Sequence, residues 1–152
     1  MQSQYVSDVR KSAEEDFASG LYCAKSVVMS LAKAQGIESD LLPRLATAFC
    51  SAMARTCSTC GALTGAIMGI SLALGRTKPG EPVQVSYAAT QRLVGEFEQE
   101  FGARDCHVLL GCDIGTPEGQ ATFQESGLKE RCAKYTSKAA EIAACIVSEA
   151  KG

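Results

Sequence analysis

Eight cysteines stand beside a single histidine in this chain of 152 residues. Two of the cysteines form a CxxC motif, Cys57-Ser-Thr-Cys60, which places two sulfur atoms within reach of one metal ion or of each other. Thiolates bind soft metal ions and iron–sulfur clusters, and pairs of thiols also exchange electrons as disulfides. The cysteines therefore predict metal binding or thiol–disulfide chemistry, unless they are simply small apolar residues of the core.

Cys60 lies at the start of a segment that we expect to be helical, from about residue 60 to residue 74. The N-terminus of a helix carries partial positive charge and free N–H groups, and both favour a thiolate. We therefore expect the pKa of the Cys60 thiol to be lowered, as in a nucleophile or a metal ligand. Cys23 lies near another expected helix start and can share this effect.

Three more cysteines lie at expected helix ends, and helix ends can converge on one site in a small bundle. These are Cys106, Cys112 and Cys132. His107 is the one imidazole of the chain, so a Cys/His pair would have to use it, but a lone histidine is more often a surface or packing residue. Cys50 and Cys145 have apolar or off-face positions that indicate packing.

The composition limits the classes of function. The chain is 46% hydrophobic and 21% charged, enough for a real core, and its net charge of −2 argues against nucleic-acid binding. The polar N-terminus has no apolar signal core, and the most apolar run, 61–75, is shorter than the roughly 20 residues that span a bilayer. We expect a cytoplasmic protein without a membrane partner, and the reducing cytoplasm disfavours a static disulfide framework.

The hydrophobic pattern predicts one all-α domain over residues 1–152, a bundle of about six to seven helices. The expected segments are 3–18, 21–36, one that begins at 41 and stops before a break at 55–59, then 60–74, 86–101, 105–110, one that begins at 117, and 128–149. Leu41, Leu45, Ala48 and Phe49 form the expected apolar face of the third segment. These helices must position the cysteines.

The last expected helix has the most regular apolar stripe. Its members recur at a 4-3-4-3-4 spacing, which places them on one face of a helix: Leu128, Cys132, Tyr135, Ala139, Ile142 and Ile146. Cys132 therefore faces the core near the N-terminal end of this helix, whereas Cys145 lies off the stripe.

Gly61, Gly65 and Gly69 recur at four-residue spacing on one face of the segment 60–74. Glycine costs about 1 kcal/mol relative to alanine inside a helix, so three on one face need a compensating reason. Close approach of another helix backbone is the favoured interpretation. A bound group or a dimer interface along this face would serve equally well.

Several separated pieces of the chain are recognisable together. They are Gly20-Leu-Tyr-Cys23-Ala24, Cys60-Gly-Ala-Leu-Thr-Gly65, Phe101-Gly102, Cys106, Leu110-Gly-Cys112-Asp113, Thr116-Pro-Glu-Gly119 and Cys132. In this order, and over nearly the whole chain, they resemble the CGCAxxGCC family, which is named for its cysteine pattern. The resemblance implies that Cys23, Cys60, Cys106 and Cys132 are the defining cysteines, and it implies redox activity or a prosthetic group such as an iron–sulfur cluster.

The chain departs from the family pattern in two ways. Some relatives carry an export signal, which the N-terminus here does not show. The stretch before Cys60 is often glycine-rich in relatives but here reads Cys50-Ser-Ala-Met-Ala-Arg-Thr-Cys57. Cys57 and Cys112 are therefore additional to the four, as further ligands, as resolving thiols or without a role.

Three hypotheses follow, and none of them assigns an enzyme class. The first is an iron–sulfur cluster or other metal at Cys23, Cys60, Cys106 and Cys132, for electron transfer or redox sensing. The second is metal-free thiol–disulfide chemistry, with Cys60 as nucleophile and Cys57 or Cys23 as its partner. The third is a structural protein that dimerises through the Gly61/Gly65/Gly69 face. The expected partners are a redox protein or a second copy of the chain.

Overall fold

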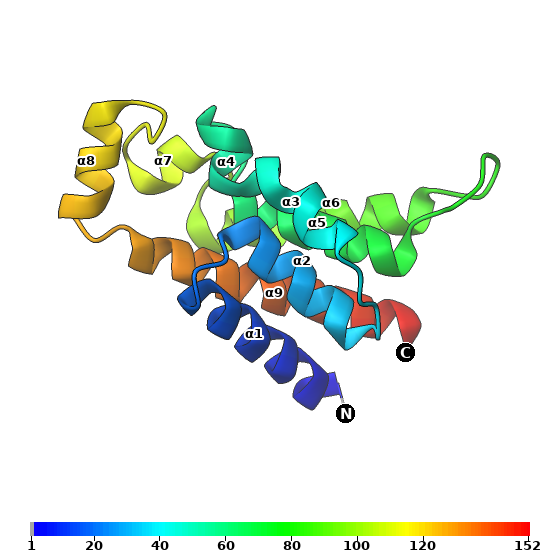
Figure 1. Ribbon diagram of the computed structural model, residues 1–152. Coiled ribbons are helices and arrows are strands. Elements are labelled where there is room, and N and C mark those ends of the chain that lie inside the picture. The colour runs from blue at the N-terminus through cyan, green and yellow to red at the C-terminus, as the bar shows by residue number, and fades with distance from the viewer. Residues whose placement is uncertain (1) are drawn as a thin grey trace.

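The computed structural model describes residues 2–152, which fold almost entirely into helices (Figure 1). The elements are α1 (Gln2–Ala18), α2 (Cys23–Ala34), α3 (Leu41–Ala46), the 3-10 turn η1 (Thr47–Phe49), α4 (Cys50–Arg55), α5 (Gly61–Leu74), α6 (Gln84–Phe101), α7 (Cys106–Leu110), α8 (Pro117–Glu125) and α9 (Lys129–Lys151). The expected all-α fold is confirmed. The helices slightly outnumber the six to seven expected, because the chain turns at η1 and forms α4 separately from α3.

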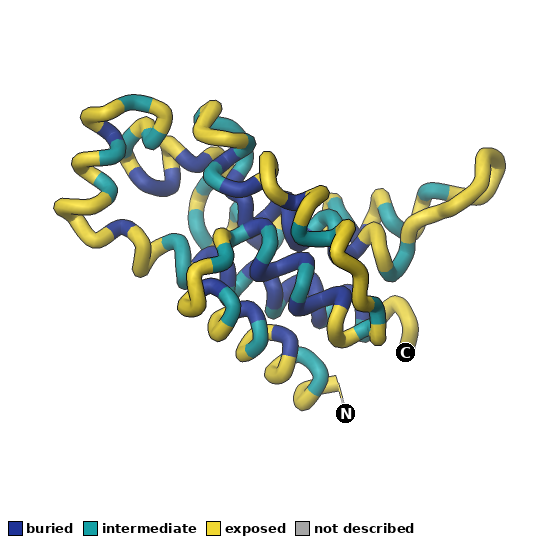
Figure 2. The backbone as a smooth tube through the Cα atoms, viewed as in Figure 1, coloured by how far each residue is buried: buried dark blue, intermediate teal, exposed yellow. Residues whose placement is uncertain are grey.

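The long helix α9 organises the bundle. It contacts α1, α2, α5 and α6, and α2 also packs against α1 and α5 (Figure 1). The predicted stripe of α9 is buried at Tyr135, Ala139, Ile142 and Ile146, while Cys132 is half-buried near the N-terminal end. Figure 2 shows the buried backbone gathered in the middle of the molecule, between these helices.

The glycine face of α5 packs against α2 of the same chain. A Cβ atom built on Gly65 would lie 2.5 Å from the carbonyl oxygen of Ala24, and one on Gly69 would collide with the side chain of Leu31. The glycines therefore allow α2 to approach at backbone distance, as the packing interpretation predicted. The alternative of dimerisation through this face is wrong, because α2 covers it; dimerisation elsewhere stays a prediction.

The apolar face predicted for the third segment does not join the core. Leu41 is 61% exposed, Leu45 is 66% exposed and Phe49 is 39% exposed, whereas Ala46 is fully buried. The helix α3 spans six residues before η1 changes the direction of the chain. The helix therefore ends before it is long enough to place these side chains on one buried face.

A left-handed turn follows η1, in the stretch that precedes the CxxC motif. Residues Ser51, Ala52, Met53 and Ala54 have φ between 56° and 59°, and Arg55 has a φ of 66°. None of these residues is glycine, and the left-handed conformation costs other residues roughly 1–2 kcal/mol each. This turn forms α4.

The two ends of the bundle differ. The loop 75–83 projects at one end, whereas α7, α8 and the start of α9 lie at the other (Figure 1). In the chain from residue 2 onward, no helix combines the length and the hydrophobicity needed to cross a membrane.

Candidate functional site

A cavity of about 530 Å³ lies at the end of the bundle that carries α7 and α8. Cys23, Cys60, Cys106 and Cys132 all line it. Each comes from a different helix start: Cys23 and Cys106 are the first residues of α2 and α7, Cys60 directly precedes α5, and Cys132 lies in the first turn of α9. The structure thus brings together the four cysteines singled out in the sequence.

A short antiparallel bridge between Thr59 and Asp105 fixes two of these cysteines side by side. The backbone N–H of Cys60 donates to the carbonyl of Arg104 at 2.8 Å, and the N–H of Cys106 donates to the carbonyl of Ser58 at 2.9 Å. Because each bond satisfies a backbone group at a helix start, the bridge aligns the beginnings of α5 and α7.

Gly61 makes room for the third cysteine. A Cβ atom on this glycine would collide with the Sγ atom of Cys23 and would lie 3.1 Å from the carbonyl oxygen of Phe49. The absence of a side chain therefore allows the Cys23 sulfur to lie against the first turn of α5, next to Cys60. This contact gives the Cys-Gly-Ala motif a physical role in the site.

Tyr135 connects α7 to α9 and so fixes Cys106 relative to Cys132. Its hydroxyl donates to the carbonyl of Leu109 at 3.1 Å, and its ring packs edge-on against Phe101 with centroids 4.8 Å apart. The hydroxyl of Thr136 donates to the carbonyl of Cys132 at 2.8 Å. The aromatic contacts and the hydrogen bonds hold this wall of the cavity in one arrangement.

Burial raises the pKa values of the cysteines that line the cavity. It raises the pKa of Cys106 to about 11 and that of Cys132 to about 12, and the neighbouring Cys23 adds to both shifts. Burial also raises the pKa of Cys60, although the backbone N–H groups of Ala62 and Leu63 act in the opposite direction. The lowered pKa expected for Cys60 is therefore wrong, because desolvation outweighs the helix N-terminus.

The cysteines surround the cavity and do not meet at one point. Among residues 2–152, no three histidine, cysteine, aspartate or glutamate side chains are close enough to bind a single metal ion. No histidine or carboxylate is found among the described residues that line the cavity, so the cysteine sulfurs are its strongest ligands for soft metal ions.

Cys57 and Cys112 do not line the cavity. The Cys57 thiol donates to Oδ1 of Asp113 at 2.6 Å, and the same oxygen accepts the N–H of Gly115 at 2.7 Å. The hydrogen bond raises the pKa of Cys57 and lowers that of Asp113. Of the two cysteines in the CxxC motif, only Cys60 therefore faces the cavity, and a ligand or resolving role for Cys57 or Cys112 stays a prediction.

The remaining candidates lie outside the site. Cys50 is buried and its thiol donates to the carbonyl of Ala46 at 3.5 Å, as expected for a packing residue. Cys145 is half-buried along α9 and lines no part of the cavity. His107 is exposed and likewise does not line the cavity.

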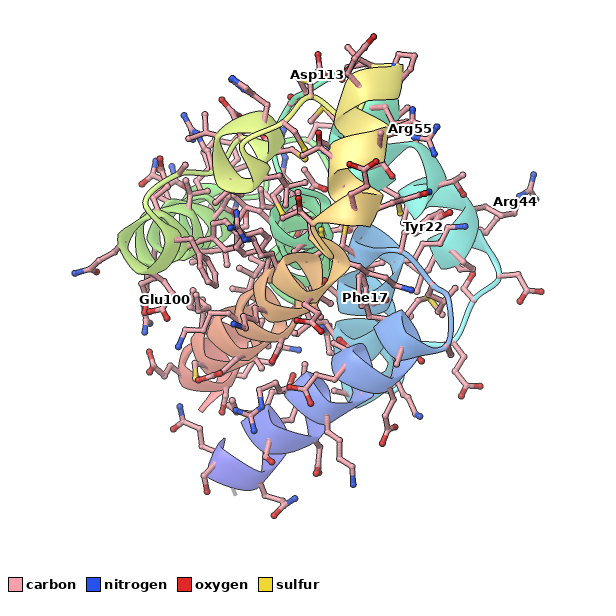
Figure 3. All side chains as sticks on the ribbon, turned by 90° about the vertical axis from the view of Figure 1, so that its left-hand side faces the viewer. Phe17, Tyr22, Arg44, Arg55, Glu100 and Asp113 are labelled. Atoms are coloured by element: carbon pink, nitrogen blue, oxygen red, sulfur yellow. The ribbon has the colours of Figure 1, made fainter. Side chains whose placement is uncertain are left out.

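Sequence reasoning missed the outer wall of the cavity. Gln120, Phe123 and Gln124 recur on α8 with the spacing of one helix face, a signal that was present in the sequence. Arg55 and Lys129 also line the cavity, but they come from distant segments and no local pattern connects them. Figure 3 views this end of the molecule and labels Phe17, Tyr22 and Arg55, with Arg55 next to α8 and Phe17 near the start of α9.

Comparison with known proteins gives a family match. A sequence profile of the C_GCAxxG_C_C family, described as "Putative redox-active protein (C_GCAxxG_C_C)", matches residues 21–146. No curated protein and no solved structure matches the chain. The matched range contains all four cysteines of the cavity and the segments that position them. The chain therefore belongs to the C_GCAxxG_C_C family.

Proposed function

We propose that Cys23, Cys60, Cys106 and Cys132 bind an iron–sulfur cluster and that the protein transfers electrons or senses redox state. The observation that supports this proposal is the convergence of these four thiols, from four helix starts, on one cavity. Four cysteines are the usual ligand set of such clusters.

The donor set and the spacing fit a polynuclear group. The available donors are thiols, which select iron–sulfur clusters and zinc over hard cations. No three of these groups reach one ion as they stand in residues 2–152, whereas in a cluster different cysteines bind different metal atoms. The sulfurs line a cavity of about 530 Å³, which has room for a group larger than one ion.

The protein's own residues hold this site. The bridge at Thr59 and Asp105 holds Cys60 beside Cys106, and Gly61 admits Cys23. Buried thiols with raised pKa values are neutral at pH 7, so metal loading must release their protons to solvent. When bound, the cluster supplies one-electron redox chemistry, which the thiols alone do not.

Thiol–disulfide chemistry is the second candidate function, and the contact between Cys23 and the start of α5 favours the pair Cys23 and Cys60. In this reaction the two thiols lose two electrons and two protons to a disulfide substrate, and one S–S bond forms as another breaks. The raised pKa of Cys60 slows such an attack at neutral pH, because the thiolate is the nucleophile.

Anaerobic reconstitution with ferrous iron and sulfide tests the first proposal. We expect bound iron, acid-labile sulfide and visible absorption in the wild-type protein, and loss of these in Cys23→Ser, Cys60→Ser, Cys106→Ser and Cys132→Ser. Cys145→Ser is the matched control, a cysteine away from the cavity, and should retain the iron.

Two outcomes would refute the cluster. Protein that stays colourless and iron-free under these conditions excludes it, and iron that survives all four serine substitutions excludes the site. A disulfide between Cys23 and Cys60 in the iron-free protein, found by peptide mapping after mild oxidation, would instead support the second candidate.

A further inference from the structure

The outer part of the cysteine cavity is positively charged. Arg55 and Lys129 both line it, and no carboxylate does so among the described residues. This sign contrasts with the whole chain, whose net charge is −2. The ion pairs found in residues 2–152 involve Arg10, Arg92 and Lys138, so neither cavity cation is neutralised by a neighbouring carboxylate there.

Apolar and aromatic side chains form the walls between these cations. Phe17 contributes from α1, Ile114 from the loop before α8, and Phe123 from α8 itself. The Nζ atom of Lys129 lies 5.9 Å from the centroid of the Phe17 ring, so one aromatic face is already held beside one cation. In Figure 3, Arg55 lies next to α8, and Phe17 lies near the start of α9.

The size of the cavity suits a small molecule. Its volume of about 530 Å³ lies within the range of about 300–1,000 Å³ that is typical of ligand pockets. Gln120 and Gln124 add amide groups from α8, and such a mixture of apolar wall and few polar groups is typical of these pockets. The cavity therefore has room and polarity for more than the four sulfurs.

We propose that the mouth of this cavity binds a small organic anion, with its apolar body against Phe17, Ile114 and Phe123 and its anionic group between Arg55 and Lys129. This assignment goes beyond the proposed function and does not depend on it, because the cations and the apolar walls are features of the polypeptide alone. Together, the two proposals place the bound anion beside the redox group.

Fluorescence titration with two probes tests the proposal. Anilinonaphthalene sulfonate carries an anionic group on an apolar aromatic body, and phenylnaphthylamine is its uncharged analogue. We expect the full-length protein to bind the sulfonate more tightly than the amine. Arg55→Gln and Lys129→Gln should each weaken sulfonate binding about threefold, and the double variant about tenfold, with the amine unaffected.

An isosteric change places a negative charge at the same mouth. Gln124 is exposed and lines the cavity, so Gln124→Glu should weaken sulfonate binding several-fold without altering the fold. Gln91→Glu on the exposed face of α6 is the matched control and should change nothing. Arg44→Gln tests the exposed Leu41, Leu45 and Phe49 as a competing dye site.

The proposal is overturned if the wild-type protein binds neither probe, or if Gln124→Glu and Gln91→Glu have equal effects. It is also overturned if Arg44→Gln weakens sulfonate binding while Arg55→Gln does not, because the dye then lies on α3. These titrations use metal-free protein, so their result does not depend on whether reconstitution with iron succeeds. The anion-binding proposal and the cluster proposal can therefore be refuted independently.

Discussion

Ala54 offers a direct test of the left-handed turn. Its φ of 57° and ψ of 42° lie in the left-handed helical region, and its side chain is exposed. Replacing it by glycine removes only a methyl group that makes no core contact. The effect on stability therefore reports the backbone conformation alone.

The magnitude follows from two opposing terms. Glycine relieves the roughly 1–2 kcal/mol that a Cβ atom costs in this conformation. It also increases the conformational entropy of the unfolded chain, which costs about 0.5–1 kcal/mol. We therefore expect Ala54→Gly to raise the free energy of unfolding by about 0.5–1 kcal/mol, which for a chain of this size corresponds to an increase in Tm of roughly 1–4 °C.

Ala88→Gly is the matched control. Ala88 is also exposed, but it lies in the right-handed helix α6. There glycine relieves no backbone strain and still increases the conformational entropy of the unfolded chain. This variant should lose about 0.5–1 kcal/mol. The two alanine-to-glycine changes thus have opposite signs if the turn is left-handed, and they differ by about 1–2 kcal/mol.

Urea and thermal denaturation of metal-free protein, followed by circular dichroism, measure both variants. Coincident transitions by circular dichroism and by fluorescence would support the two-state treatment that the comparison requires. If Ala54→Gly destabilises the protein as much as Ala88→Gly does, the residues before the CxxC motif are not left-handed, and the account of this turn fails.

Two further predictions concern the helix interface and the pair beside the site. Gly65→Ala should destabilise the protein by about 2 kcal/mol or more, because its Cβ atom would lie 2.5 Å from the carbonyl oxygen of Ala24. The control Gly95→Ala, on the open face of α6, should stabilise the protein by about 0.5–1 kcal/mol. Equal denaturation midpoints for the two variants would contradict the close packing of α2 on α5. Asp113→Asn should speed alkylation of Cys57 at pH 8, because the Asp113 carboxylate raises the pKa of that thiol and the thiolate is the reactive form. The increase in rate should vanish at high pH, where Cys57 is ionised in both proteins. If site-resolved mass spectrometry finds no change in the alkylation rate at pH 8, the hydrogen bond between Cys57 and Asp113 is refuted.

Features that depend on local pattern could be predicted from the sequence. The stripe on α9 is buried because a 4-3-4-3-4 spacing places its members on one helix face whatever they pack against. The glycines of α5 indicated close packing because three glycines on one helix face are unfavourable without it. The four cysteines could be selected because the chain resembles a family that they define; position at helix ends alone also indicated Cys112, which does not line the cavity.

Features that depend on tertiary context could not be predicted. The pKa of Cys60 is set by burial among other thiols, which no local motif reveals, and desolvation there exceeds the effect of the helix N-terminus. Leu41 and Leu45 have a helical spacing, but the chain turns before a helix long enough to bury them has formed. Arg55 and Lys129 line the same cavity only because the chain brings the end of α4 and the start of α9 to it.

Hydrogen bonds hold the left-handed turn at both of its ends. At its start the buried Cys50 thiol bonds to the carbonyl of Ala46, and at its end the N–H groups of Thr56 and Ser58 both donate to the carbonyl of Ala52. Five non-glycine residues in this conformation cost roughly 5–10 kcal/mol, so surrounding packing must offset the strain.

The left-handed turn lies where it can position residues of the cysteine cavity. Ser51 at its start and Arg55 at its end both line the cysteine cavity, while the chain leaves the turn toward Cys60 and the bridge to Asp105. A right-handed helix through the same residues would place the side chains of 51 and 55 on a different face relative to α5. Glycine at Ala54 should therefore make the turn easier to form without altering the cavity, whereas proline at Ala54, whose ring fixes φ near −65°, should disrupt both the turn and anion binding at Arg55.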